Sequence, residues 1–219
     1  MAIDILYDRE VTCLYCGKTF TTKKVRNSKL ILKKRDADFC MHYEGESPYY
    51  YEISVCPHCS YAFSGSFSPV REVYFAALQK SYFEQVGRIQ LCGVRNLQDA
   101  LRSYKLALVC GSIVKEPRYV IAGILLRLAW LYRFQGDTDE EKKYIHKALG
   151  QYYLVYENGE HDKCGLGEHR LWYLLGELNG RLDNIEEALR WFNRLISEKT
   201  VDPALKKATR ERWSEYRNV

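Results

Sequence analysis

Two cysteine pairs near the N-terminus constrain this chain most. Residues 13–16 read Cys-Leu-Tyr-Cys and residues 56–59 read Cys-Pro-His-Cys. In each pair, a tight turn can bring two sulfur atoms to one side of the backbone. Four thiolates complete the tetrahedral shell of a structural Zn²⁺ site, and such a shell leaves no open position for water or substrate. The spacing therefore predicts one structural zinc ion held by Cys13, Cys16, Cys56 and Cys59.

The connector between the two pairs is long. It runs for 39 residues, from Gly17 to Val55, whereas pairs in zinc sites are commonly separated by about 15–20 residues. We expect the connector to form its own hairpin. Gly17 suits a left-handed turn directly after the first pair, and Ser60 stands at the equivalent position after the second. Either pair alone could instead be a redox dithiol, and sulfur spacing does not distinguish zinc from iron.

Other cysteines and histidines lie near the two pairs or farther along the chain. Cys40, His42 and His58 could each bind metal, but four cysteines already complete the shell, so we expect none of the three to be a ligand. Buried cysteine behaves as a small hydrophobic residue, and this is the role we expect for the cysteines in or beside predicted helices: Cys92, Cys110 and Cys164.

Size and composition indicate a soluble globular protein. The chain has 219 residues, of which 47% are hydrophobic and 28% charged, enough for one large domain or two small ones. The N-terminus lacks the pattern of a signal peptide. The best apolar run, Val120 to Leu126, is much shorter than the ~20 residues needed to cross a bilayer. We expect a cytoplasmic protein with no membrane contact, in which paired cysteines bind metal instead of forming disulfides.

The two parts of the chain have different patterns. Residues 1–68 predict short strands and turns, among them strands near 29–32 and 51–55. From about residue 71 the pattern becomes helical, with a boundary at Ser68-Pro69. The expected helices cover residues 71–91, 97–113, 118–135, 139–156, 168–180, 185–198 and a last segment opening at 202–203. The predicted fold is α+β, mainly α, with a zinc-ribbon-like β module (1–68) followed by a helical domain (69–219).

The helices carry an internal repeat. Trp172-x₂-Leu175-Gly176, then Ala188-x₃-Phe192, then a late proline match the tetratricopeptide repeat template. Residues 97–113 and 118–135 resemble parts of earlier repeats. Such helix pairs stack into a curved surface that often holds a protein or peptide, so we expect a protein or peptide partner for residues 69–219. The alternative is an ordinary helical bundle whose groove is not used.

A basic stretch offers a second function. The net charge of the chain is only +5, but residues 17–35 contain eight basic side chains and no acidic one. Lys23, Lys24, Lys33 and Lys34, with tyrosines at 43 and 49–51, could bind nucleic acid through phosphate contacts and stacking. Acidic residues follow directly after this stretch, however, and cancel much of its positive electrostatic field. We therefore favour a solvated hairpin whose tyrosines pack inward, and keep nucleic-acid binding as the alternative.

The chain contains no recognisable catalytic motif. It has no P-loop, no Gly-x-Ser-x-Gly and no His-Glu-x-x-His, so we expect a protein that is not an enzyme. An enzyme or redox switch using Cys40 is the remaining alternative. Asp36 and Asp38 could form an acid–base or metal-binding pair, but their basic neighbours favour a solvated or salt-bridged strand end.

Three segments resemble a known family. Cys-x-x-Cys-Gly-Lys-x-Phe (13–20), Arg-Asp-Ala-Asp-Phe-Cys (35–40) and Pro-x-Tyr-Tyr-Glu-x-x-Val-Cys-Pro-x-Cys-x-Tyr-Ala, beginning at Pro48, are similar to the uncharacterised bacterial domain-of-unknown-function family 2225. The resemblance implies a bacterial cytoplasmic protein with a zinc-ribbon-like head and a tetratricopeptide-like tail. It implies that the four cysteines named above correspond to the metal-binding cysteines of the family, and it does not indicate a substrate. Ser60 departs from the glycine expected after the second pair.

Overall fold

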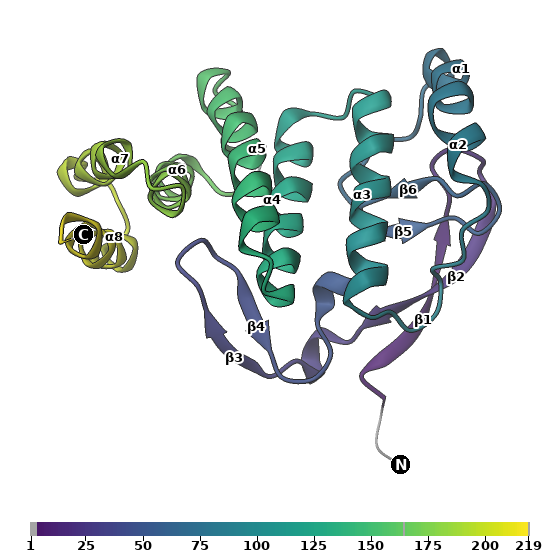
Figure 1. Cartoon of the computed structure of the whole chain (residues 1–219), viewed down its shortest axis with the longest axis horizontal. Helices are drawn as coiled ribbons and strands as arrows, with labels where there is room; N and C mark the ends of the chain where they lie inside the picture. The colour runs from purple at the N-terminus through teal and green to yellow at the C-terminus, as the bar shows by residue number, and fades with distance from the viewer. Residues whose placement is uncertain (1–3, 164, 219) are drawn as a thin grey trace.

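A small β-rich head is followed by a row of helices (Figure 1). The computed structural model describes residues 4–163 and 165–218, so Cys164 lies outside the described residues. The predicted class, α+β and mainly α, is confirmed. Among the described residues, no helix is both long and apolar enough to cross a membrane.

The described part of the head contains three two-stranded antiparallel sheets. Strand β1 (Leu6–Thr12) pairs with β2 (Thr19–Val25), β3 (Leu32–Arg35) with β4 (Met41–Tyr43), and β5 (Ser54–Val55) with β6 (Ala62–Phe63). The first and third hairpins each enclose a cysteine pair in the turn, and the connector forms the middle hairpin, as expected.

Two predicted strands are wrong in part. The segment expected as a strand at 29–32 contains the end of a 3₁₀ turn, η1 (Asn27–Lys29), and β3 begins only at Leu32. Residues 51–53 are not a strand either, because a second 3₁₀ turn, η2 (Pro48–Tyr51), comes before β5. Proline lacks the N–H that a sheet ladder needs. The guanidinium of Arg95 binds the carbonyl oxygens of Tyr50 and Ile53 at 3.1 and 2.7 Å, in place of a partner strand.

The first predicted helix, 71–91, is too long. This region folds as η3 (Glu72–Tyr74), α1 (Phe75–Leu78), the π-helical turn η4 (Gln79–Phe83) and α2 (Glu84–Val86). The helix ends at Gly87, whose φ is +65°, so the predicted end at residue 91 is wrong. The next residues instead bond to the head: Ile89 N–H donates to Ser60 Oγ at 3.0 Å and Lys23 N–H to Cys92 O at 2.9 Å.

The six later helices agree with the prediction to within two residues. They are α3 (Leu97–Ile113), α4 (Arg118–Gln135), α5 (Thr138–Glu157), α6 (Glu168–Arg181), α7 (Ile185–Ser197) and α8 (Pro203–Arg217). Their starts follow from local chemistry. Asn96 and Asp99 form a reciprocal capping box on α3. Asp202 caps α8, with proline at its first position.

Neighbouring helices pack as successive pairs. Helix α4 lies against α5, α6 against α7, and α7 against α8. The contact of α6 with α7 depends on Gly176: a Cβ there would lie 2.6 Å from the ring of Phe192. These two residues occupy the glycine and phenylalanine positions of the predicted repeat. The tetratricopeptide assignment itself stays a prediction.

This close approach can be tested by adding one methyl group. Gly176→Ala should destabilise the protein by about 1–3 kcal/mol, since the buried Phe192 ring must move. The matched control is Gly150→Ala in α5, where a Cβ meets nothing within 4 Å; this change should stabilise by about 0.5–1 kcal/mol because alanine is the better helix former. Urea unfolding monitored by circular dichroism measures both. Equal effects would contradict the packing described.

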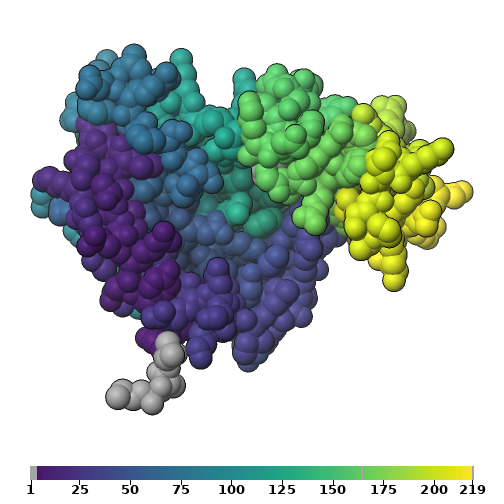
Figure 2. Space-filling view, turned by 180° about the vertical axis from the view of Figure 1, so that it is seen from behind, coloured from purple at the N-terminus to yellow at the C-terminus, as the bar shows by residue number. Residues whose placement is uncertain are grey.

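Buried side chains of the head and the helices form one continuous cluster. Phe67 of the head packs under α3, where a Cβ on Gly111 would touch its ring at 3.0 Å. In Figure 2 the two parts form one continuous surface, with the C-terminal helices at the far end. The expected division near residue 68 remains a prediction.

Candidate metal centre

The two cysteine pairs sit in turns of the same geometry. In the first, Gly17 has a φ of +69°, its N–H donates to Cys13 O at 3.1 Å, and Cys13 N–H donates to Lys18 O at 3.0 Å. In the second, Ser60 has a φ of +65°, its N–H donates to Cys56 O at 2.7 Å, and Cys56 N–H donates to Tyr61 O at 2.9 Å. Serine at position 60 therefore leaves the turn unchanged.

Ser60 is held in this conformation by its side chain. Positive φ is unfavourable for a residue with a Cβ. The Ser60 Oγ donates to Gly87 O at 2.8 Å and accepts from Ile89 N–H at 3.0 Å. The Ser60 carbonyl oxygen also accepts from Tyr82 O–H at 2.7 Å. These bonds offset the strain and tie the second turn to η4 and to the segment after α2.

Ser60→Ala should lower the stability of the protein more than the removal of a single oxygen atom suggests. It keeps the Cβ at positive φ but leaves the buried Ile89 N–H and Gly87 O without their partner, at an expected loss of about 1–3 kcal/mol. Ser112→Ala is the control, because the Ser112 hydroxyl is exposed and bonds only within its own helix. Thermal unfolding compares the two. A Ser60→Ala protein as stable as the Ser112→Ala protein would contradict this role.

The four sulfur atoms converge. All lie within 4.8 Å of one another, with Cys13 Sγ 3.6 Å from Cys59 Sγ and Cys16 Sγ 3.8 Å from Cys56 Sγ. Metal–sulfur bonds of about 2.3 Å, the value for zinc thiolates, place tetrahedral ligands about 3.8 Å apart. The seven cysteines in the described residues are all free thiols. The cluster can therefore hold one metal ion with four sulfur ligands.

Hydrogen bonds and burial shift the pKa values of the cluster thiols in different directions. The pKa of Cys13 is lowered to about 5, mainly by a hydrogen bond from Cys59. The same bond raises the pKa of the Cys59 thiol. Burial raises the pKa of Cys56 to about 11. Backbone N–H groups also point at the sulfurs, from Tyr15 and Cys16 toward Cys13. A metal ion that binds here would displace the protons of the thiols that are still protonated.

The other candidate ligands lie outside this cluster. His58 is exposed. Cys40 and His42 come together with Asp36 in a second group whose ligand atoms lie within 4.8 Å of one another. His42 Nε2 is 2.6 Å from Asp36 Oδ2, but the same oxygen accepts from Arg133 Nη1 at 2.8 Å. Burial raises the pKa of Cys40 to about 12, so its thiol stays protonated and is a poor nucleophile.

Asp36 and Asp38 belong to a network that the sequence alone did not reveal. We call it the Arg133 network. Arg133 in α4 binds Asp36, Asp38 at 2.5 Å and Glu141 at 2.7 Å. The carboxylate of Asp38 is fully buried and also accepts from Trp130 Nε1 at 3.0 Å. The salt bridge was expected, but its partner is distant in sequence, and no local pattern could identify it.

The network continues into the last helices. Arg181 lies 3.6 Å from Asp38 and 2.9 Å from the buried Glu177, and Arg212 in α8 donates to Glu177 at 2.8 Å. Burial opposes the charged form of Asp36, but hydrogen bonds from His42, Arg133 and Lys34 outweigh it and lower its pKa to about 2. Acidic and basic groups thus balance one another between the β3–β4 hairpin and four helices.

The four candidate lysines have different environments. Lys23, Lys33 and Lys34 pair with acidic residues of the head, at 3.0, 3.9 and 3.2 Å. Lys24 turns inward, and its ammonium donates to the carbonyl oxygens of Tyr51 and Glu52 at 2.5 and 3.4 Å. The tyrosines that could have stacked on bases are buried (Tyr49, Tyr51) or half-buried (Tyr43, Tyr50).

The fold and the site define a mainly helical α+β protein with a four-cysteine cluster that can hold a metal ion. A family model described as an uncharacterized protein conserved in bacteria, domain-of-unknown-function family 2225, matches residues 6–216. The chain belongs to this family. A search of curated proteins found no match.

Proposed function

We propose that this protein is a zinc-binding adaptor of the bacterial cytoplasm. A structural Zn²⁺ bound by Cys13, Cys16, Cys56 and Cys59 holds the head together, and the helices bind a protein or peptide partner. The convergence of four sulfurs from two identical turns supports the zinc site most directly. A complete sulfur shell has no position for substrate, which favours a structural role over a catalytic one.

Metal analysis of purified protein tests the zinc site. We expect one equivalent of zinc per chain and X-ray absorption that fits four sulfur ligands at about 2.3 Å. Less than half an equivalent of zinc in the native protein, unchanged by Cys56→Ser, would reject the site. One equivalent of iron would instead reject the choice of metal.

The partner-binding role rests on the helical array. Helices α7 and α8 lie farthest from the head (Figure 1) and expose polar faces to solvent. A photo-crosslinking residue at the exposed Arg190 of α7, in the full chain in its native host, should give a defined adduct with one protein. The same residue at exposed Lys18 of the head is the control. Identical adducts at both positions, or none at Arg190, would argue against an adaptor that uses its helices.

Nucleic-acid binding is the second candidate. Strand β3 is exposed along its whole length and presents Lys33 and Lys34 at its surface. Reversing both charges should weaken binding to single- and double-stranded probes and lower the dependence of log K on log salt by about 2. Lys23→Glu is a separate arm, because Lys23 is half-buried on another hairpin. Absence of salt-sensitive binding by the native protein would eliminate this function.

A further inference from the structure

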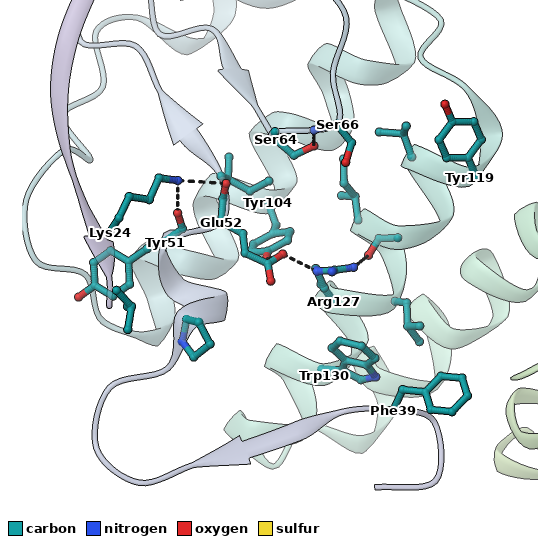
Figure 3. Close-up of a pocket in the computed structure, with 18 of the residues that line it drawn as sticks. Lys24, Phe39, Tyr51, Glu52, Ser64, Ser66, Tyr104, Tyr119, Arg127 and Trp130 are labelled. Carbon is teal, nitrogen blue, oxygen red and sulfur yellow. Dashed lines mark hydrogen bonds and ion pairs between the residues drawn. The ribbon is translucent and has the colours of Figure 1, made fainter. Parts of the chain in front are cut away.

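A cavity of about 770 Å³ lies between the head and the helices, and no cysteine of the metal cluster lines it. Its walls come from β1, β2, η2 and the loop after β6 on one side, and from α4 and the middle of α6 on the other. Tyr104 of α3 and Tyr152 of α5 also line it. Figure 3 shows the two walls facing each other across the space. Cavities of roughly 300–1,000 Å³ are typical of sites for small organic ligands.

The charged residues that line the cavity are mostly basic. They are Arg9, Lys24, Arg127 and Lys163, against one acid, Glu52. The Glu52 carboxylate is already bound by Arg127 and by Tyr104 O–H at 2.9 Å. Lys163 pairs with Glu160, outside the lining. Arg9 and Lys24 remain as positive charges with no carboxylate partner in the described part of the chain.

Lys24 and Arg127 still have N–H groups to offer. Figure 3 shows them on opposite sides of Glu52. Lys24 uses two N–H groups on backbone carbonyls, and its third has no partner among the described residues. Arg127 binds Glu52 through Nε and Gly123 O through Nη1, which leaves Nη2 without a hydrogen-bond partner within residues 4–163 and 165–218. Burial, then Arg95 and Arg9, lowers the pKa of Lys24 to about 8, and a bound anion would relieve that repulsion.

The helical wall combines Arg127 of α4 with apolar side chains. Val120 and Ile124 of α4 and Leu174 of α6 line it, together with the ring of Tyr119. One ligand can satisfy both walls only if it carries an anionic group and an apolar or aromatic group. A phosphate fits the basic side better than a single carboxylate, because it brings up to two negative charges and three acceptor oxygens.

We propose that this cavity binds a phosphate-bearing organic molecule of about nucleotide size. Its phosphate lies at Lys24, Arg9 and the free N–H groups of Arg127, and its apolar part lies against α4. The site is separate from the zinc cluster and from the outer faces of α7 and α8, so it adds a small-molecule ligand to the proposed adaptor.

Pyridoxal phosphate is a suitable probe, because it combines a phosphate, an aromatic ring and an aldehyde. The Lys24 amine attacks the aldehyde, an imine forms with loss of water, and borohydride reduces the C=N bond to a stable secondary amine that mass spectrometry locates. Its low pKa alone makes Lys24 reactive toward any aldehyde. The test is therefore the comparison with pyridoxal, which lacks the phosphate. We expect pyridoxal phosphate to label Lys24 at about tenfold lower concentration than pyridoxal, a difference of about 1.4 kcal/mol.

Competition and matched variants complete the experiment. Adenosine monophosphate should protect Lys24, adenosine should not, and Lys23 should show neither preference nor protection. Arg9→Glu should abolish the preference for the phosphate-bearing probe. Arg102 is also exposed but lies on α3, outside the cavity lining, so Arg102→Glu should leave the preference intact. Equal labelling by the two aldehydes, or no protection by the nucleotide, would overturn the proposal. Zinc content is measured in the same samples, so failure here is distinguishable from failure of the metal site.

Discussion

Cys56→Ser should reduce bound zinc from one equivalent per chain to less than about a tenth and unfold the head. Loss of a structural metal is among the few single changes expected to destabilise a protein by more than about 4 kcal/mol. For a chain of this size that corresponds to a fall in Tm of roughly 8–16 °C. We expect the head to depend on the ion because the hairpin around the second cysteine pair is short, with β5 and β6 two residues each. Zinc analysis and differential scanning calorimetry measure the two effects.

Cys92→Ser is the matched control for this experiment. Cys92 is half-buried beside the head, and its thiol makes only a weak contact with Val55 O at 3.7 Å. We expect full zinc content and a fall in Tm of no more than roughly 4 °C. Removal of metal from the native protein with a chelator should reproduce the Cys56→Ser result. Native-like stability of the metal-free protein would show that the head does not need the ion.

Arg133→Met should be the most destabilising substitution outside the metal cluster. It leaves the fully buried Asp38 carboxylate with Trp130 and the more distant Arg181 as its remaining partners. Breaking a buried ion pair by removing one partner typically destabilises by about 3–5 kcal/mol, since the remaining charge is uncompensated. Urea unfolding gives the magnitude. Hydrogen exchange should show faster opening of the β3–β4 hairpin, because Arg133 joins its turn to α4.

Two further variants distinguish the loss of stability caused by breaking the Arg133 network from that caused by removing any one charge. Lys34→Met removes an exposed partner of Asp36 and should change the stability by less than about 1 kcal/mol. The double variant Arg133→Met, Asp38→Asn should recover part of the stability lost in Arg133→Met, because the buried charge is removed with its partner. An Arg133→Met protein no less stable than Lys34→Met would contradict the role assigned to the network.

The features predicted correctly depend on residues close in sequence. The spacing of Cys13 and Cys16 predicted a turn without any knowledge of the rest of the fold. Residues 202–203 marked the start of the last helix because capping involves neighbouring residues. The α+β class followed from such local signals, and so did the six later helices.

The features missed depend on contacts between distant residues. Gly87 ends a helix that the local pattern would continue, because the next residues bond to Ser60. The strand expected at 51–55 is shortened because Arg95 binds the carbonyl oxygens of Tyr50 and Ile53. Lys24 was expected on a basic surface, whereas its ammonium turns toward Tyr51 and Glu52. In each case the deciding partner is at least 27 residues away in sequence, so periodicity and propensity carry no information about it.

The bonds around the second turn and the Arg133 network set an order of events during synthesis of the chain. When Cys59 leaves the ribosome, all four cysteines of the cluster are present, but the partners of Ser60 at Gly87 and Ile89 are not yet made. Arg133 follows later, and Arg212, which completes the ion pairs of Glu177, later still. The head is thus translated before the helices that secure it and reaches its final form only after them. A truncated product would carry the metal ligands without the contacts that secure them.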